Sequence, residues 1–378
     1  MPKILLGVSS SYCASFLRGQ VSFLKKNGYE VLVVSGPGPE IRYLAETEGA
    51  KLYEVDFTKK ITPFKDLVIL LQLVRLLKKE KPDIVNAGNP KSGFLIMLAC
   101  WLTRQRKRVF TMHGLLSDTQ KGGREKLIAA TERIACNVAD RVIVVSRSLQ
   151  HHAEKRKLLP AGKSVIIENG SCNGINTAYF SRTQALHAAA MTLKKDLGLT
   201  EGPVLGFVGR ISKDKGVDQL LEVFNTLKVL HPDLQLLLAG PVEEDTEGIA
   251  GIRNALARTK DVFCTGMLFD VRVAYMAMDI LVLPSLREGL PNVLLEASSM
   301  ELPVVASDIP GCRDAITVRL TGELFPKNDR TALKEILEKL IGNEGLRRQY
   351  GMNGRKFVEE HFLDEKIWQG QLKLYGGL

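Results

Sequence analysis

A short run of glycine and cationic residues stands out because its residue types suit a diphosphate. The segment GRISKDKG (209–216) follows the apolar run 204–208 directly. Glycine lets a backbone approach phosphate oxygens closely, while Arg210 and Lys215 can neutralise their charge. The same residues also suit a solvated basic loop, so the run alone leaves two interpretations open.

A second motif, SLREGLPNVLLE (285–296), follows the apolar run 280–284. Pro291 is typical of an early helical position, which puts Glu288 in the preceding loop and Glu296 about two turns into the helix. The free amides at such a helix start favour an anion. Glu288 would repel a phosphate, so its carboxylate is better suited to accept hydrogen bonds from sugar hydroxyls.

Both motifs follow apolar runs of a kind that recurs along the chain. Continuous Val, Ile and Leu segments belong to parallel sheets covered on both faces, and their alternation with helical patterns indicates a doubly wound α/β fold. The predicted strands are 3–8, 30–35, 83–87, 108–112, 141–146, 164–167, 204–208, 234–239, 262–264, 280–284 and 303–307. Ligands of such sheets bind beyond the carboxyl ends of the strands, where both motifs lie.

The strand series restarts after the polar, alanine-rich stretch 181–199, which indicates two Rossmann-like domains. We predict an N-terminal domain over residues 1–177 and a C-terminal domain over residues 178–361. Helical patterns are predicted for 64–80, 94–102 and 123–139, and for nearly all of the tail 344–375.

Composition excludes several classes of protein. The chain has 378 residues, 45% of them hydrophobic and 25% charged, which is ordinary for a packed core and not for a disordered chain. Six cysteines are scattered without a C-x-x-C pair, which argues against a zinc ribbon or a disulfide framework. The N-terminal apolar run is too short for a signal peptide, and no stretch reaches the roughly 18–20 apolar residues that span a bilayer. We therefore expect a cytoplasmic protein.

The charge is uneven along the chain. Residues 1–180 carry 28 Lys and Arg against 15 Asp and Glu, whereas the remaining residues carry 24 against 27. A basic half suggests a polyanion, an acidic membrane surface or a phosphorylated substrate as a partner, or a merely basic domain. Candidate membrane contacts are Trp101, Arg104, Arg106, Lys107 and Arg108, together with Lys78, Lys79 and Lys81.

Taken together, the motifs resemble the retaining GT-B glycosyltransferases of family 4. The resemblance rests on GRISKDKG and REGLPNVLLE, and it continues into VIVVSRSL (142–149), ENGSCNGINTAYF (168–180), LLLAGPVEED (236–245), NPKSG (89–93) and TMHG (111–114). It covers nearly the whole chain. The N-terminal motifs are most similar to the branch that builds bacterial capsule, O-antigen and exopolysaccharide units on a polyprenyl-diphosphate carrier. The resemblance implies two domains that face each other across a cleft, with a C-terminal helix (362–378) that crosses back to the N-terminal domain.

The resemblance also implies roles for single residues. Arg210 and Lys215 would hold the donor diphosphate, Glu288 the hydroxyls of the donor sugar, and Glu296 the ribose. His113, directly after a predicted strand, would face the donor sugar from the N-terminal domain. Further donor contacts would come from Gly209, Gly266, Met267, Leu268, Gly289 and Leu290.

The acceptor side departs from the family pattern. Family members often carry a Gly-Gly pair in the first loop, whereas this chain has GVSSSY (7–12). Ser10 and Ser11 in that loop, with Arg18 after it and Lys91 in NPKSG, are the candidate contacts to an acceptor or its phosphate.

The resemblance implies a UDP-sugar donor carrying a hexose or an N-acetylhexosamine, and a polyprenyl-diphosphate-linked saccharide as acceptor. No cofactor or metal is expected, because no D-x-D is present and the acidic run 243–247 has the composition of a solvated loop. A nucleotide-sugar 2-epimerase of the same architecture, or transfer to a soluble acceptor, is the alternative. The chain has no G-x-G-x-x-G after the first predicted strand, which argues against a dinucleotide-dependent dehydrogenase. It also lacks the clustered aromatic residues that stack on bases, so no nucleic-acid partner is expected.

Overall fold

The computed structural model describes residues 1–58, 62–243 and 248–378. The chain divides into two compact units, 1–174 with 364–378 and 175–363. The boundaries predicted from the sequence are 177/178 and 361/362. The stretch 181–199, where the strand series restarts, is largely the helix α7 (Gln184–Leu197) of the second unit.

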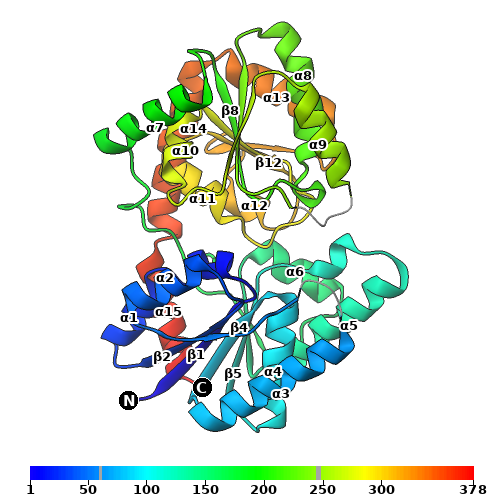
Figure 1. The fold of residues 1–378 in the computed structure, drawn as a ribbon, viewed down its shortest axis with the longest axis vertical. Coiled ribbons are helices and arrows are strands. Elements are labelled where there is room, and N and C mark those ends of the chain that lie inside the picture. The colour runs from blue at the N-terminus through cyan, green and yellow to red at the C-terminus, as the bar shows by residue number, and fades with distance from the viewer. Residues whose placement is uncertain (59–61, 244–247) are drawn as a thin grey trace. The chain divides into compact units, whose positions relative to one another are not determined.

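The described residues of the N-terminal unit form a sheet of seven parallel strands in the order β3-β2-β1-β4-β5-β6-β7. The strands are β1 (Lys3–Gly7), β2 (Glu30–Ser35), β3 (Lys51–Glu54), β4 (Ile84–Gly88), β5 (Lys107–Met112), β6 (Arg141–Val144) and β7 (Ser164–Val165). The helices are α1 (Gln20–Lys26), α2 (Pro39–Glu48), α3 (Pro63–Glu80), α4 (Phe94–Leu102), α5 (Gly122–Val138), α6 (Arg147–Lys155) and α15 (Asp364–Gly376). Because parallel crossovers are right-handed, α1 and α2 cover one face of this sheet, and α3, α4 and α5 cover the other (Figure 1).

The described residues of the C-terminal unit form a six-stranded parallel sheet in the order β10-β9-β8-β11-β12-β13. Its strands are β8 (Val204–Val208), β9 (Gln235–Ala239), β10 (Val262–Gly266), β11 (Ile280–Leu283), β12 (Val304–Ser307) and β13 (Gly322–Phe325). Besides α7, its helices are α8 (Val217–Leu230), α9 (Ile249–Arg258), α10 (Arg272–Ala277), α11 (Asn292–Ser299), α12 (Cys312–Ala315), α13 (Arg330–Ile341) and α14 (Glu344–His361). The prediction of two Rossmann-like sheets is confirmed, although β3 and β13 were missed.

The predicted continuous apolar strands lie in the core. Every residue of β8, β9 and β11 is buried, as expected of strands covered on both faces. The tail is two helices, because α14 ends at His361 and α15 starts at Asp364. Within the described parts of the chain, no helix combines the length and the apolar character needed to cross a membrane.

The last helix, α15, packs within the N-terminal unit. The Asn86 amide donates a hydrogen bond to the buried Tyr375 hydroxyl at 2.7 Å, and the Trp368 indole donates to Asn173 Oδ1 at 2.6 Å. These two bonds fix the C-terminal helix to β4 and to the segment after β7. The helix itself starts at Asp364, two residues after the predicted 362.

Candidate active site

Two loops of the C-terminal unit carry the two sequence motifs, and backbone hydrogen bonds hold them together. The segment 209–216 follows β8 and the segment 284–291 follows β11, and these two strands are neighbours in the sheet. The amide of Leu286 donates to the carbonyl of Asp214 at 2.9 Å. The side-chain amide of Gln219 donates to the carbonyl of Pro284, also at 2.9 Å. The cationic turn and the glutamate loop therefore form one surface.

Gly216 allows this close approach. Its φ is +69°, which disfavours other residues, and a Cβ at this position would overlap the carbonyl oxygen of Pro284. The second glycine of GRISKDKG is therefore required by packing between the two loops, independently of any ligand.

Lys215 and Glu288 form an ion pair at the centre of this surface. Lys215 Nζ lies 2.6 Å from Glu288 Oε1, and the side chains are 20% and 12% exposed. Both charges are largely withdrawn from water, so each depends on the other for compensation. The structure thus brings together the predicted diphosphate cation and the predicted sugar-binding carboxylate.

Arg210 is also paired with carboxylates. Its Nη2 lies 3.1 Å from Asp214 Oδ2, and its Nη1 contacts Glu243 on the segment after β9. Burial alone would raise the pKa of Asp214, but Arg210, the Ser212 hydroxyl and nearby cations lower it below its usual value, so Asp214 is anionic. Neither partner was predicted from the sequence, although Asp214 lies within the motif. Of the acidic run predicted as a loop, 244–247 lie outside the described residues.

Glu296 projects from α11, and its position differs from the prediction. Pro291 is the residue before the helix, not an early helical one, so Glu296 lies about one turn into α11 and not two. Its Oε2 accepts a hydrogen bond of 2.8 Å from the hydroxyl of Tyr275 on α10. Tyr275 is completely buried, and burial together with the Glu296 charge raises the pKa of its hydroxyl well above the usual value. This partner gave no signal in the sequence beyond an apolar helical pattern.

The remaining donor-side candidates lie along the carboxyl edge of the same sheet. Gly266 ends β10, and Met267 after it is half exposed while Leu268 packs on the core. Gly209 follows β8, and its amide donates to the carbonyl of Ala239 at 2.9 Å. In the β11 loop, the backbone of Gly289 and Leu290 packs against Gly311.

His113 in the N-terminal unit lies directly after β5. Its ring stacks on Phe16 with a centroid distance of 4.9 Å and an interplanar angle of 15°. Burial lowers the pKa of His113 to about 4, so the imidazole is neutral at physiological pH. It lines a cavity of about 20 Å³ with Asn86 and Thr111, enough for one water molecule. Gly88 makes room for the ring, because a Cβ there would overlap Nε2 of His113.

The sequence belongs to known families over most of its length. The family described as Glycosyltransferase Family 4 matches residues 15–171, and that described as Glycosyl transferases group 1 matches residues 191–357. A Staphylococcus aureus protein named "Capsular polysaccharide biosynthesis glycosyltransferase CapM" is 32% identical over 373 residues, which span 99% of this chain and 96% of that protein. This chain is a GT-B glycosyltransferase of family 4.

Other relatives of this glycosyltransferase agree with that assignment. An Escherichia coli protein named "UDP-Gal:alpha-D-GlcNAc-diphosphoundecaprenol alpha-1,3-galactosyltransferase" is 28% identical over 79% of this chain and 76% of its own length. The fold matches the crystal structure of Anabaena Alr3699/HepE in complex with UDP and glucose, with a TM-score of 0.82 at 18% identity and full coverage of both chains. It also matches sucrose-phosphate synthase from Thermosynechococcus elongatus, with a TM-score of 0.80 at 21% identity over 100% of this chain and 99% of that one. The family is one of transferases, which does not favour the epimerase alternative.

The acceptor-side candidates of this glycosyltransferase differ in burial. The buried Ser11 hydroxyl donates to Glu40 and accepts from the amide of Ile41, and the partly exposed Lys91 Nζ lies 2.6 Å from Asp66 Oδ1. Ser10, in the first loop, is partly exposed, and its hydroxyl lies 3.5 Å from the thiol of Cys13. Arg18 is exposed before α1.

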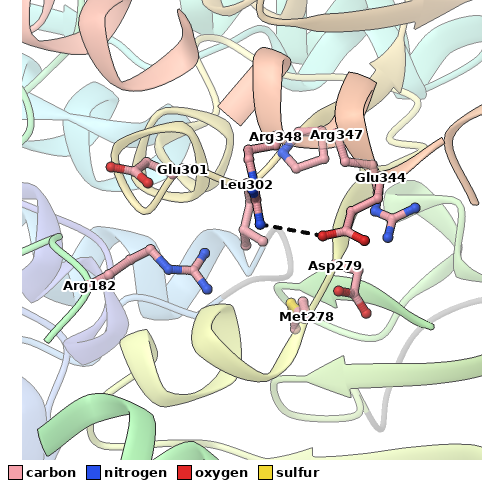
Figure 2. Close-up of a pocket in the computed structure, with 9 residues that line it drawn as sticks. Arg182, Met278, Asp279, Glu301, Leu302, Glu344, Arg347 and Arg348 are labelled. Atoms are coloured by element: carbon pink, nitrogen blue, oxygen red, sulfur yellow. Dashed lines mark hydrogen bonds and ion pairs between the residues drawn. The ribbon is translucent and has the colours of Figure 1, made fainter. Parts of the chain in front are cut away.

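A larger pocket of the glycosyltransferase lies away from all these residues. It measures about 530 Å³ and sits where β11 and β12 begin, at the opposite edge of the C-terminal sheet (Figure 2). Figure 2 shows the Arg348–Glu344 ion pair, 3.4 Å long, among its charged residues. Its other charged residues are Arg182, Arg347, Asp279 and Glu301. Three arginines thus share the pocket with three carboxylates.

Proposed function

We propose that this chain is a retaining glycosyltransferase that moves a hexose or N-acetylhexosamine from a UDP-sugar to a hydroxyl of a polyprenyl-diphosphate-linked saccharide. The observation that carries the proposal is the Lys215–Glu288 ion pair, which joins the turn that also carries Arg210, after β8, to the loop after β11. The name of the E. coli relative, which specifies UDP-galactose and a diphosphoundecaprenol-linked sugar, supports these substrate classes.

On the donor side, catalysis would come from electrostatic stabilisation of the leaving diphosphate. As the bond between the sugar C1 and the diphosphate oxygen breaks, the electron pair leaves with the diphosphate, and Arg210 and Lys215 stabilise that growing charge. The acceptor hydroxyl attacks C1 from the face that the diphosphate leaves, and its proton passes to the departing phosphate oxygen. The new glycosidic bond then keeps the anomeric configuration. We propose that these cations, without a bound metal or cofactor, suffice for the leaving group.

Each remaining candidate has a place in this scheme. Glu288 would accept hydrogen bonds from the donor sugar and Glu296 from the ribose, while the backbone of 266–268 contacts the base. Gly209, Gly289 and Leu290 would supply backbone near the phosphates. His113, held neutral, would donate a hydrogen bond to a sugar hydroxyl from the N-terminal domain.

The acceptor and the location form the last part of the proposal. The N-terminal domain would bind the lipid-linked acceptor, with Ser10, Ser11, Arg18 and Lys91 as the contacts to the acceptor or its phosphate. Because this acceptor is lipid-linked, the enzyme would act in the cytoplasm, peripherally on the acidic face of the inner membrane, with no nucleic-acid partner.

The test is radiolabel transfer. The protein is incubated with labelled UDP-hexoses or UDP-N-acetylhexosamines and polyprenyl-diphosphate sugars, with Glu288→Ala as the disabled variant. A matched control is Glu344→Ala, which removes an exposed carboxylate of the separate pocket. Label should reach the organic phase with the wild type and the control, and not with Glu288→Ala, and a chelator should leave the rate unchanged. Sugar interconversion, or label confined to the aqueous phase, would overturn the lipid-linked assignment.

A further inference from the structure

The outer face of α3 is apolar where a surface helix is normally polar. Ile69, Leu73 and Leu77 are buried beneath the helix, as its amphipathic pattern requires. On the other side Phe64 is 89% exposed, and Leu67, Val68 and Leu71 are each about half exposed. These four side chains follow the i, i+3, i+4, i+7 spacing and therefore form one continuous stripe. Such a stripe on the surface marks an interaction site.

Cations continue the same face toward the end of α3. Arg75, Lys78 and Lys79 are all exposed. The carboxylate that ends the helix, Glu80, does not compensate them, because it is buried and pairs with Lys3 and Lys51. The stripe thus passes from apolar to strongly basic along one helix.

The neighbouring helix extends the basic end. Trp101 and Leu102, the last residues of α4, are both about half exposed and border a groove of about 600 Å³ with Arg104 and Arg106. The side chain of Gln105 donates to the carbonyl of Pro82, which ties this groove to the end of α3. Helices α3 and α4 pack side by side, so the two sets of residues belong to one surface (Figure 1).

The other end of α3 lies beside the acceptor-side loop. The ion pair between Asp66 in its first turn and Lys91 in the segment 89–93 is 2.6 Å long. Phe64 lies two residues before Asp66, and Asp66 is fixed to the segment 89–93 after β4. A partner seated on the stripe would lie next to this loop.

We propose that the outer face of α3, with the Trp101 end of α4, docks on the anionic surface of a lipid bilayer. The apolar side chains enter the headgroup region while Arg75, Lys78, Lys79, Arg104 and Arg106 contact lipid phosphates. The basic charge of this surface argues against a second copy of the chain as its partner, since such pairing would bring two basic surfaces together. The docking rests on the proposed function only for its purpose, which is to hold the acceptor-side loop at the source of a lipid-linked substrate.

The experiment is co-sedimentation of the full chain with vesicles of phosphatidylcholine alone or mixed with phosphatidylglycerol. The wild type should bind the mixed vesicles more tightly. Lys78→Gln with Lys79→Gln should weaken that binding about 25-fold, since each basic residue near such a surface contributes about fivefold. Phe64→Ser with Leu71→Ser should weaken it roughly tenfold or more, because apolar area no longer enters the headgroups.

The matched control is Val229→Ser with Leu230→Ser, which removes two exposed apolar side chains from α8 in the other unit. Its vesicle binding should equal that of the wild type. Unchanged binding of the α3 variants, equal loss in the α8 control, or association of the wild type with itself instead of with vesicles would each overturn the proposal. UDP affinity, measured on the same variants without vesicles, should not change. Failure of the wild type to bind UDP would instead refute the proposed function, whatever the vesicles show.

Discussion

Nζ of Lys215 lies 2.6 Å from Oε1 of Glu288, although 73 positions separate the two residues in the chain. The contact joins the cationic turn after β8 to the glutamate loop after β11. Because both side chains are mostly buried, each charge depends on the other, and the pair is held in place. The ammonium group is thus fixed beside the carboxylate that we assign to the donor sugar, as a preorganised electrostatic site requires.

Removing either cation of this turn should mainly reduce turnover. Arg210→Ala or Lys215→Ala should lower kcat by roughly 10²–10³, about 3–4 kcal/mol, because each removes a preorganised charge from the leaving diphosphate. Lys213→Ala is the control, since this exposed lysine belongs to the same turn but is not assigned to the diphosphate. Steady-state rates of sugar transfer compare the three variants with the wild type. A loss below about fivefold in both Arg210→Ala and Lys215→Ala would refute the diphosphate assignment.

The sequence predicts strands well where apolar residues are continuous and poorly where they are not. β8 and β11 are buried throughout, so composition alone identifies them. β3, with sequence KLYE, is an edge strand with exposed ends, and nothing in it suggests burial. β13 contains Glu323, a buried carboxylate that accepts a hydrogen bond of 2.8 Å from Tyr350 on α14 and pairs with Lys339 on α13. Such long-range compensation is invisible in a local pattern.

The same limit applies to the candidate site. The rule that ligands bind at the carboxyl ends of parallel strands indicates the two correct loops, because it depends only on strand order. It does not indicate that Glu243 pairs with Arg210, or that Tyr275 holds Glu296, because these contacts join separate loops and helices through side chains. The helix start at Asn292 was also misplaced, since Pro291 suits both the position before a helix and its first turn.

Tyr275→Phe should weaken donor binding without affecting the fold. The change removes the hydroxyl that donates to Glu296 at 2.8 Å and keeps the buried ring. Losing one such hydrogen bond to a carboxylate should raise KM for the UDP-sugar roughly 5- to 20-fold, about 1–2 kcal/mol, with a smaller change in kcat. Initial rates at varied donor concentration check this. An unchanged KM, with Glu296→Ala still impaired, would mean that Tyr275 does not position the carboxylate.

Gly88→Ala should move His113. A Cβ at Gly88 would overlap Nε2 of the imidazole, and the ring is confined on its face by Phe16. We expect turnover to fall about tenfold or more, because a misplaced group loses its transition-state contact. Gly123→Ala is the matched control, since a Cβ there meets nothing within 4 Å. Kinetics at pH 7, with circular dichroism for the fold, compare the two; equal activity of both variants would exclude a steric role for Gly88.

His113 should also make stability depend on pH. Its pKa is about 4 in the folded protein, because burial disfavours the charged ring, against an ordinary value of 6.5. Between these values the unfolded chain binds a proton that the folded chain does not, so stability is complete above pH 6.5 and falls as the pH drops toward 4. The loss from this group should reach up to about 2 kcal/mol at pH 5. His113→Gln cannot titrate, so its free energy of unfolding in urea should fall less than that of the wild type between pH 7 and pH 5. Equal decreases would show that the ring takes up its proton as readily in the folded protein as in the unfolded chain, and would remove the basis for a neutral imidazole at the site.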